Sequence, residues 1–218
     1  IDLYYLHRID LNVPVEDSVG ALMDMKDQGK IRFIGLSEPS PKTLEKALKL
    51  CPIAAVQSEL SLWTSTPNDA VAEMCGQSGI AFVSYSPLGR GFLGGKIRDM
   101  GLLTEKDIRH TMPRFQADNF VSNLKLLDEL SALAYENGIT AAQLALAWVL
   151  GQGEHILAIP GTRFEDSAKE NLDSADIALD ESVLVKAAEI LSPFTVLGER
   201  WNEKLLMEVD SEQYRYSD

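Results

Sequence analysis

Short apolar runs alternate with segments of helical periodicity five times along the chain, and this order constrains the fold more than any other feature. The runs have the length of strands and cover residues 1–7, 31–36, 54–57, 80–85 and 156–159. Between them, apolar side chains recur every three or four positions, which is typical of amphipathic helices. Buried strands joined by helices form a parallel sheet with both faces covered. We therefore predict a single α/β domain over residues 1–218, while periodicity leaves open whether its sheet is open or closed.

Capping residues indicate where several of the predicted helices begin. Ser40–Pro41 is typical of a helix start, because serine caps free N–H groups and proline is tolerated in the first turn. The same reasoning places further starts at Thr66–Pro67 with Asp69, Thr140 with Gln143 as a capping box, Thr162 with Glu165, and Asp180. Residues 86–118 form a long glycine-rich connection, which at this length we expect to be functional or mobile. Residues 193–218 are predicted to be an irregular, polar tail.

Composition excludes several classes of protein. The net charge of -13, from 20 basic and 33 acidic residues, would repel nucleic acid. The longest apolar run, residues 144–150, is far shorter than the roughly 20 residues of a membrane span. The first residues lack the pattern of a signal peptide. Cys51 and Cys75 are too few for a disulfide framework, and the histidines lack metal-ligand spacing, so we expect buried thiols, no metal and a cytoplasmic location.

Polar residues follow the predicted strands directly, at the point where each apolar run ends. In parallel α/β folds the working residues lie at these carboxyl ends. The five ends are His7–Arg8, Ser37–Glu38, Gln57, Tyr85 to Gly91, and Pro160 to Arg163. Their convergence predicts a binding site at this edge of the sheet.

The last two strand ends resemble an anion site. Glycines at 89, 91, 94 and 95 allow close approach of backbone N–H groups to a ligand, and Arg90 and Lys96 add positive charge. Gly161–Thr162–Arg163 precedes a helix, and Arg163 can hold a phosphate through two parallel hydrogen bonds. Alternatively, the glycines serve turns and the basic side chains are solvated. The presence of both loops favours a nucleotide phosphate.

Individual residues at these ends have two interpretations each. His7 can donate to a carbonyl oxygen or assist its protonation, although a lone histidine is more often a core residue bonded to a neighbour. Tyr85 can stack on a flat heterocycle or pack in the core, and Gln57 can bond a carboxamide or satisfy a backbone group. Four apolar residues can line a substrate pocket or serve packing alone: Phe92, Met112, Phe115 and Trp201.

Five ordered motifs along the chain resemble the aldo-keto reductases, in particular the pyridoxal-reductase-like branch. They are residues 2–8, 30–37, 55–57, 85–91, and 159–163 with 170–171. The resemblance implies that His7 orients the substrate carbonyl, that Ser37 and Gln57 bond the cofactor's carboxamide, and that Tyr85 stacks on its nicotinamide. It also implies that the pyrophosphate lies on Ser86, Pro87, Leu88, Gly89, Arg90 and Gly91, near Lys96, and that the adenosine 2′-phosphate and adenine lie on Gly161, Thr162, Arg163, Glu170 and Asn171.

The family fold is a (β/α)8 TIM barrel, and the motifs correspond to its strands 4 to 8. The resemblance implies NADPH-dependent reduction of small aldehydes or ketones to alcohols by hydride transfer. The family's catalytic aspartate, tyrosine and lysine belong to strands that would precede Ile1, so we expect a fragment or truncated form with little activity alone. Glu38 replaces a family asparagine, which puts a carboxamide contact at that position in doubt, and Ser167 replaces a second phosphate-binding arginine.

Two alternatives remain from the sequence. The first is an NADPH-binding regulatory or sensing subunit of the potassium-channel β-subunit type. The second is a phosphate-binding α/β barrel unrelated to reductases. In the barrel interpretation, strands 4 to 8 alone have two unpaired edges and an uncovered inner face. Such a section should be marginally stable, aggregation-prone or dimeric.

Overall fold

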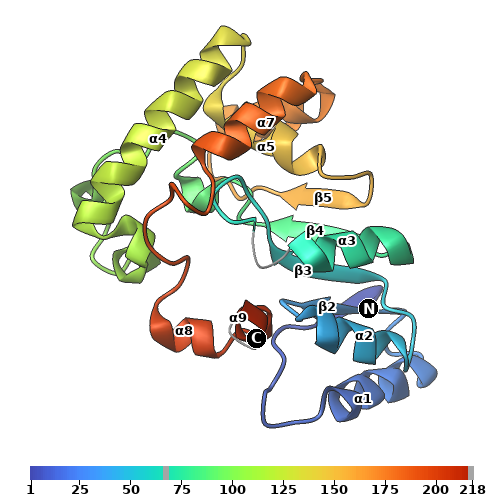
Figure 1. The fold of residues 1–218 in the computed structure, drawn as a ribbon. Helices are drawn as coiled ribbons and strands as arrows, with labels where there is room; N and C mark the ends of the chain where they lie inside the picture. Colours follow the sequence, from blue (N-terminus) through green and yellow to red (C-terminus); the bar gives the residue numbers. More distant parts are fainter. Residues whose placement is uncertain (66–68, 216–218) are drawn as a thin grey trace.

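A computed structural model of the protein describes residues 1–65 and 69–215. Its five strands form one parallel sheet in the order β1-β2-β3-β4-β5, with each strand paired to its neighbours in sequence (Figure 1). The strands are β1 (Leu3–Leu6), β2 (Phe33–Ser37), β3 (Ala55–Glu59), β4 (Ala81–Tyr85) and β5 (Ile156–Ile159). The predicted parallel α/β architecture is therefore confirmed for the described residues.

Helices follow the strands as the periodicity predicts. They are α1 (Val15–Asp27), α2 (Pro41–Leu48), α3 (Asp69–Ser78), α4 (Ala117–Glu136), α5 (Ala141–Leu150), α6 (Glu165–Asp173), α7 (Glu181–Ile190), α8 (Glu203–Met207) and α9 (Asp210–Arg215). Short 3₁₀ helices are η1 (Gly89–Gly91), η2 (Met100–Leu102), η3 (Ile108–Thr111), η4 (Pro113–Phe115) and η5 (Ser174–Asp176). The expected irregular tail is wrong in part, because α8 and α9 form there.

Two of the five predicted helix caps are present with their side-chain hydrogen bonds. Ser40 accepts a hydrogen bond from the Thr43 amide at 3.2 Å, and Thr140 and Gln143 form the full capping box. The predicted start at Thr66–Pro67 lies outside the described residues. Asp180 occupies the N-cap position of α7 without a side-chain cap bond.

The Thr162 cap is wrong. Phe164 is the N-cap of α6, because Thr162 Oγ1 accepts from the Phe164 amide at 3.2 Å in a local turn before the helix begins.

The two faces of the sheet differ in burial. One face packs against helices and carries buried side chains: Ile34, Leu36, Val56, Phe82 and Ile156. On the other face, Phe33, Leu157 and Ile159 are 48%, 53% and 48% exposed. The prediction that both faces are covered is therefore wrong in part for the described residues, since Ala55 and Glu59 on this second face are buried while Phe33, Leu157 and Ile159 are exposed. β1 and β5 each pair with a single neighbour, so both outer edges of the sheet are unpaired among these residues.

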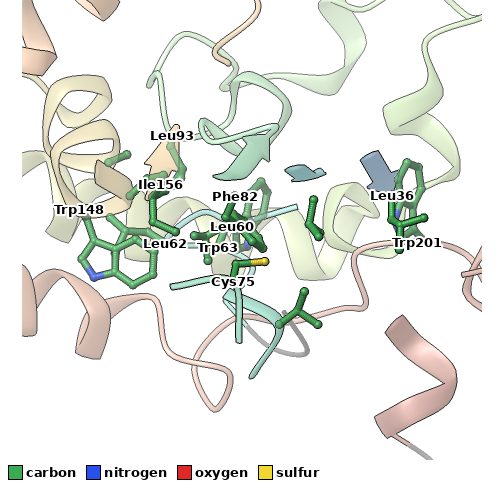
Figure 2. Close-up of a cluster of buried hydrophobic side chains, with 14 of the residues drawn as sticks. Leu36, Leu60, Leu62, Trp63, Cys75, Phe82, Leu93, Trp148, Ile156 and Trp201 are labelled. Atoms are coloured by element: carbon green, nitrogen blue, oxygen red, sulfur yellow. The ribbon is translucent and has the colours of Figure 1, made fainter. Parts of the chain in front are cut away.

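The core runs along the helix-covered face. Figure 2 shows part of it, with Trp148 and Ile156 near one end and Leu36 and Trp201 near the other. Phe92, Met112, Phe115 and Trp201 are all buried members of the core, which favours the packing interpretation. The long connection is thus ordered by its own buried residues. Cys51 and Cys75 are buried free thiols, as predicted.

No helix among the described residues is long and apolar enough to cross a membrane. Within the same residues, no group of three or more histidine, cysteine, aspartate or glutamate side chains could hold a metal ion.

Candidate functional site

Strand register brings the predicted site residues to one edge of the sheet. Leu6 pairs with Leu36, so His7 and Ser37, which follow them, lie at neighbouring strand ends. Ser37 pairs with Gln57, and Tyr85 pairs with Ile159. The carboxyl ends of the five strands therefore carry adjacent polar groups, as the sequence predicts.

His7 is an exposed side chain directly after β1. Its carbonyl oxygen accepts a hydrogen bond from Arg8 Nη1 at 2.8 Å, and the same Nη1 donates to Ser37 Oγ at 3.0 Å. Because the side chain is exposed, the core-histidine interpretation is wrong for the described residues. Arg8, which the sequence analysis placed at this strand end without a role, joins the ends of β1 and β2 through these bonds.

Gln57 is half-buried and contacts a tyrosine that the sequence analysis missed. The Tyr5 ring lies over Gly35, where an added Cβ would come within 2.5 Å of the ring. The pKa of Tyr5 is raised by burial, and its hydrogen bond with Gln57 opposes that shift. The signal for this contact was the glycine inside β2, since glycine in a strand marks a close approach.

Glu38 is 1% exposed and belongs to a buried ionic cluster. Arg200 Nη2 donates to Glu38 Oε2 at 2.7 Å, and Arg200 Nη1 donates to Glu59 Oε2 at 3.3 Å. Arg200 Nε also donates to Glu212 Oε1, and the Ser211 hydroxyl donates to Glu38. The Glu38 carboxylate is thus committed to the C-terminal tail, and sequence reasoning missed the cluster because Arg200 and Glu212 lie in a segment without periodicity.

The charges and the burial of this cluster determine the protonation states of Glu38 and of the neighbouring Tyr85. Burial raises the pKa of Glu38, but the charge and hydrogen bonds of Arg200 outweigh it and bring the value to about 2. Burial, followed by the negative charges of Glu38 and Glu59, holds the pKa of Tyr85 well above its ordinary value. Glu38 is therefore an anion and Tyr85 a neutral phenol at neutral pH.

The connection after β4 begins with a tightly wound turn. Gly89, Arg90 and Gly91 have φ angles of 53°, 56° and 87°, so three consecutive residues are left-handed. The Gly89 amide donates to the Ser86 carbonyl at 2.8 Å and the Gly91 amide to the Leu88 carbonyl at 3.0 Å. The Gly89 and Gly91 amides are therefore hydrogen-bonded within the turn itself.

The connection also reaches the segment after β5. Lys96 Nζ donates to Ser167 Oγ at 2.7 Å and lies 4.0 Å from Glu170 Oε2. This contact joins the glycine-rich connection to α6, the helix that follows the Gly161–Arg163 loop.

The segment after β5 presents exposed polar groups. Gly161, Thr162 and Arg163 are exposed, and Asn171 is half-buried. Glu165 and Asp166 occupy the first turn of α6 and complement its dipole.

Comparison with known proteins identifies the family. The model of the aldo/keto reductase family matches residues 1–191, and the chain therefore belongs to this family. The chain is 42% identical to probable aldo-keto reductase 1 of Glycine max over 92% of its own length and 58% of that protein. It is 40% identical to the aldo-keto reductase yakc [NADP(+)] of Schizosaccharomyces pombe, again over 92% of its length and 60% of the relative. The chain thus spans about three-fifths of these relatives.

A solved structure supports the same fold. The glycerol dehydrogenase AKR11B4 from Gluconobacter oxydans superposes with a TM-score of 0.79 at 29% identity. The match covers 88% of this chain and 58% of the dehydrogenase.

Proposed function

We propose that this chain provides the cofactor-binding part of an NADPH-dependent reductase that converts small aldehydes or ketones to alcohols. The observation that carries the proposal is that His7, Ser37, Gln57 and Tyr85 all lie within two residues of the carboxyl ends of the neighbouring strands β1 to β4. The name of the Schizosaccharomyces pombe relative, which specifies NADP(+), supports the choice of cofactor.

We further propose that β1 to β5 correspond to strands 4 to 8 of a (β/α)8 barrel. The exposed apolar face of the sheet supports this, because in a closed barrel it would face the interior. An open apolar hollow of about 480 Å³ beside β5, lined by residues such as Leu146, Leu157 and Leu172, also supports it. Further strands pairing with β1 and β5 would cover both features.

The side chains at the edge fit a nicotinamide cofactor. Ser37 Oγ accepts a hydrogen bond from Arg8 Nη1. The Ser37 hydroxyl proton is not used in that bond and can be donated to the carboxamide oxygen of the cofactor. Gln57 can bond the carboxamide, and the neutral Tyr85 ring can lie against the nicotinamide. When bound, NADPH supplies the hydride. His7, exposed at the end of β1, can donate a hydrogen bond that orients the substrate carbonyl.

At the other end of the site, Arg163 is the residue we assign to the adenosine 2′-phosphate, with Gly161, Thr162, Glu170 and Asn171 beside the adenine. The segment from Ser86 through Pro87 and Leu88 to Gly91, together with Lys96, is assigned to the pyrophosphate. The Lys96–Ser167 hydrogen bond supports this division because it brings both segments together.

Arg163→Ala tests the assignment. In the full-length polypeptide, by which we mean one that also contains the proposed strands pairing with β1 and β5, the Kd for NADPH should rise about tenfold or more, since a hydrogen-bonded ion pair is lost, while the Kd for NADH stays unchanged. Lys169→Ala, which removes an exposed positive charge from the helix that follows Arg163, is the matched control and should alter neither. An equal loss for both nucleotides would overturn the role of Arg163.

A further inference from the structure

Arg90 lies at the centre of the turn assigned to the pyrophosphate, yet its guanidinium is directed toward the protein. The side chain is 20% exposed, and its Nη2 lies 3.6 Å from Glu59 Oε2. The guanidinium carbon lies 4.1 Å from the centre of the Trp201 ring, the geometry of a cation–π contact. Its charge is therefore engaged by β3 and by the C-terminal tail.

The backbone of Arg90 is also held from outside the turn. A non-glycine residue at φ 56° is disfavoured and persists only where surrounding contacts over-determine it. Arg109 Nη1 donates to the Arg90 carbonyl at 3.1 Å, and Asp107 fixes the Arg109 guanidinium at 2.6 Å. With Glu59 and Trp201, three separate contacts thus keep Arg90 left-handed.

The tail that carries Trp201 is itself anchored. Trp201 is 8% exposed and follows Arg200, whose guanidinium is shared among Glu38, Glu59 and Glu212. Glu59 contacts both arginines, so it joins the anchored tail to the turn. The position of the Trp201 ring is therefore set by the same buried cluster that holds the strand ends.

We propose that Trp201 and Arg90 are positioning residues, through which the C-terminal tail sets the conformation of the Gly89–Gly91 turn. In this arrangement Arg90 shapes the turn and does not itself hold a phosphate. The inference rests on the proposed function in one respect, because it takes NADPH to be the ligand that binds this segment. Removing either side chain would let the turn adopt other conformations. The affinity for NADPH would then fall in proportion to the fraction of molecules whose turn keeps the binding conformation.

The test combines nucleotide binding with hydrogen exchange in the full-length polypeptide. Arg90→Ala, Trp201→Ala and the double variant are titrated with NADPH and NADH. Each single variant should raise the Kd for both nucleotides by a similar factor, roughly tenfold. The double variant should raise the Kd little further, because the Arg90–Trp201 contact is lost in all three variants. Trp201→Phe, which keeps an aromatic ring, should restore most of the affinity.

Hydrogen exchange reports on the turn without any nucleotide. The Gly91 and Leu93 amides, which both donate to the Leu88 carbonyl, should exchange at least several-fold faster in Arg90→Ala and in Trp201→Ala. Arg98→Ala is the control from the same connection, because Arg98 pairs with Asp128 at the surface, and it should change neither measurement.

Two outcomes would overturn the proposal. If Arg90→Ala weakens NADPH binding while Trp201→Ala leaves binding and exchange unchanged, Arg90 is a direct ligand. If neither substitution accelerates exchange in the turn, the tail does not position it. Should the unmodified protein bind no NADPH, the proposed function fails instead, and exchange still decides whether tail and turn are coupled.

Discussion

Replacing Arg200 by methionine should destabilise the fold strongly. Methionine roughly fills the volume of the side chain but removes the charge that Glu38, Glu59 and Glu212 share. Arg200 is 4% exposed, so solvent cannot replace the lost interactions. Breaking a buried ion pair by removing one partner costs about 3–5 kcal/mol of the free energy of unfolding.

The lowered pKa of Glu38 gives a second magnitude for the contribution of this ion pair to the free energy of unfolding. Its fall from 4.5 to about 2 in the folded state corresponds to about 3 kcal/mol of stability at neutral pH. Because the folded-state pKa is depressed, this contribution is present above about pH 4.5 and is lost as the pH falls toward 2. In Arg200→Met the buried carboxylates lack their cation. Acidification should protonate these carboxylates and so raise the free energy of unfolding of the variant.

Urea unfolding of both proteins between pH 7 and pH 4 checks this reasoning. The stability gap should be about 3–5 kcal/mol at neutral pH and should narrow on acidification. Arg98→Met, which breaks the exposed pair with Asp128, is the control and should cost less than about 1 kcal/mol. A gap below about 1 kcal/mol for Arg200→Met, or one that stays constant with pH, would refute the account.

Three further substitutions or reagents test local features. Thr140→Ala removes the capping box with Gln143 and should lower the free energy of unfolding by about 1 kcal/mol; no change in urea unfolding would contradict the cap. Gly35→Ala places a Cβ 2.5 Å from the Tyr5 ring, so tyrosine fluorescence should change and the free energy of unfolding should fall by about 1–3 kcal/mol. A variant with unchanged fluorescence and stability would show that the Tyr5 ring does not lie over Gly35. Burial raises the pKa of the Cys75 thiol to about 12, so a thiol reagent should modify it only on unfolding, and rapid reaction of the native protein would disprove its burial.

The sequence predicts the parallel sheet well because strand and helix periodicities are local signals. Strand bounds shift by one or two residues, and the capping box at Thr140 is found as predicted. Convergence of His7, Ser37 and Gln57 also follows from topology, since parallel strands end at one edge. By contrast, periodicity alone predicts two covered faces, whereas the exposed side chains on the inner face and the two unpaired edges follow from the barrel interpretation of the five motifs.

The buried ionic cluster lies beyond local reasoning. Glu38 and Arg200 are 162 residues apart, and each alone resembles an ordinary surface charge in the sequence. The left-handed backbone at Glu38 and Arg90 was equally invisible, because non-glycine residues adopt it only under tertiary constraint. Trp201 appeared able to line a pocket, and its contact with Arg90 could be found only in three dimensions.

Oxidation of NADPH in the presence of small aldehydes and ketones, measured with the full-length polypeptide, distinguishes a reductase from a binding subunit. We predict carbonyl-dependent oxidation of NADPH with formation of one alcohol per cofactor consumed, and slower oxidation in His7→Ala. Tight binding of NADPH without oxidation by any carbonyl compound would contradict the proposed reductase and would favour the regulatory alternative.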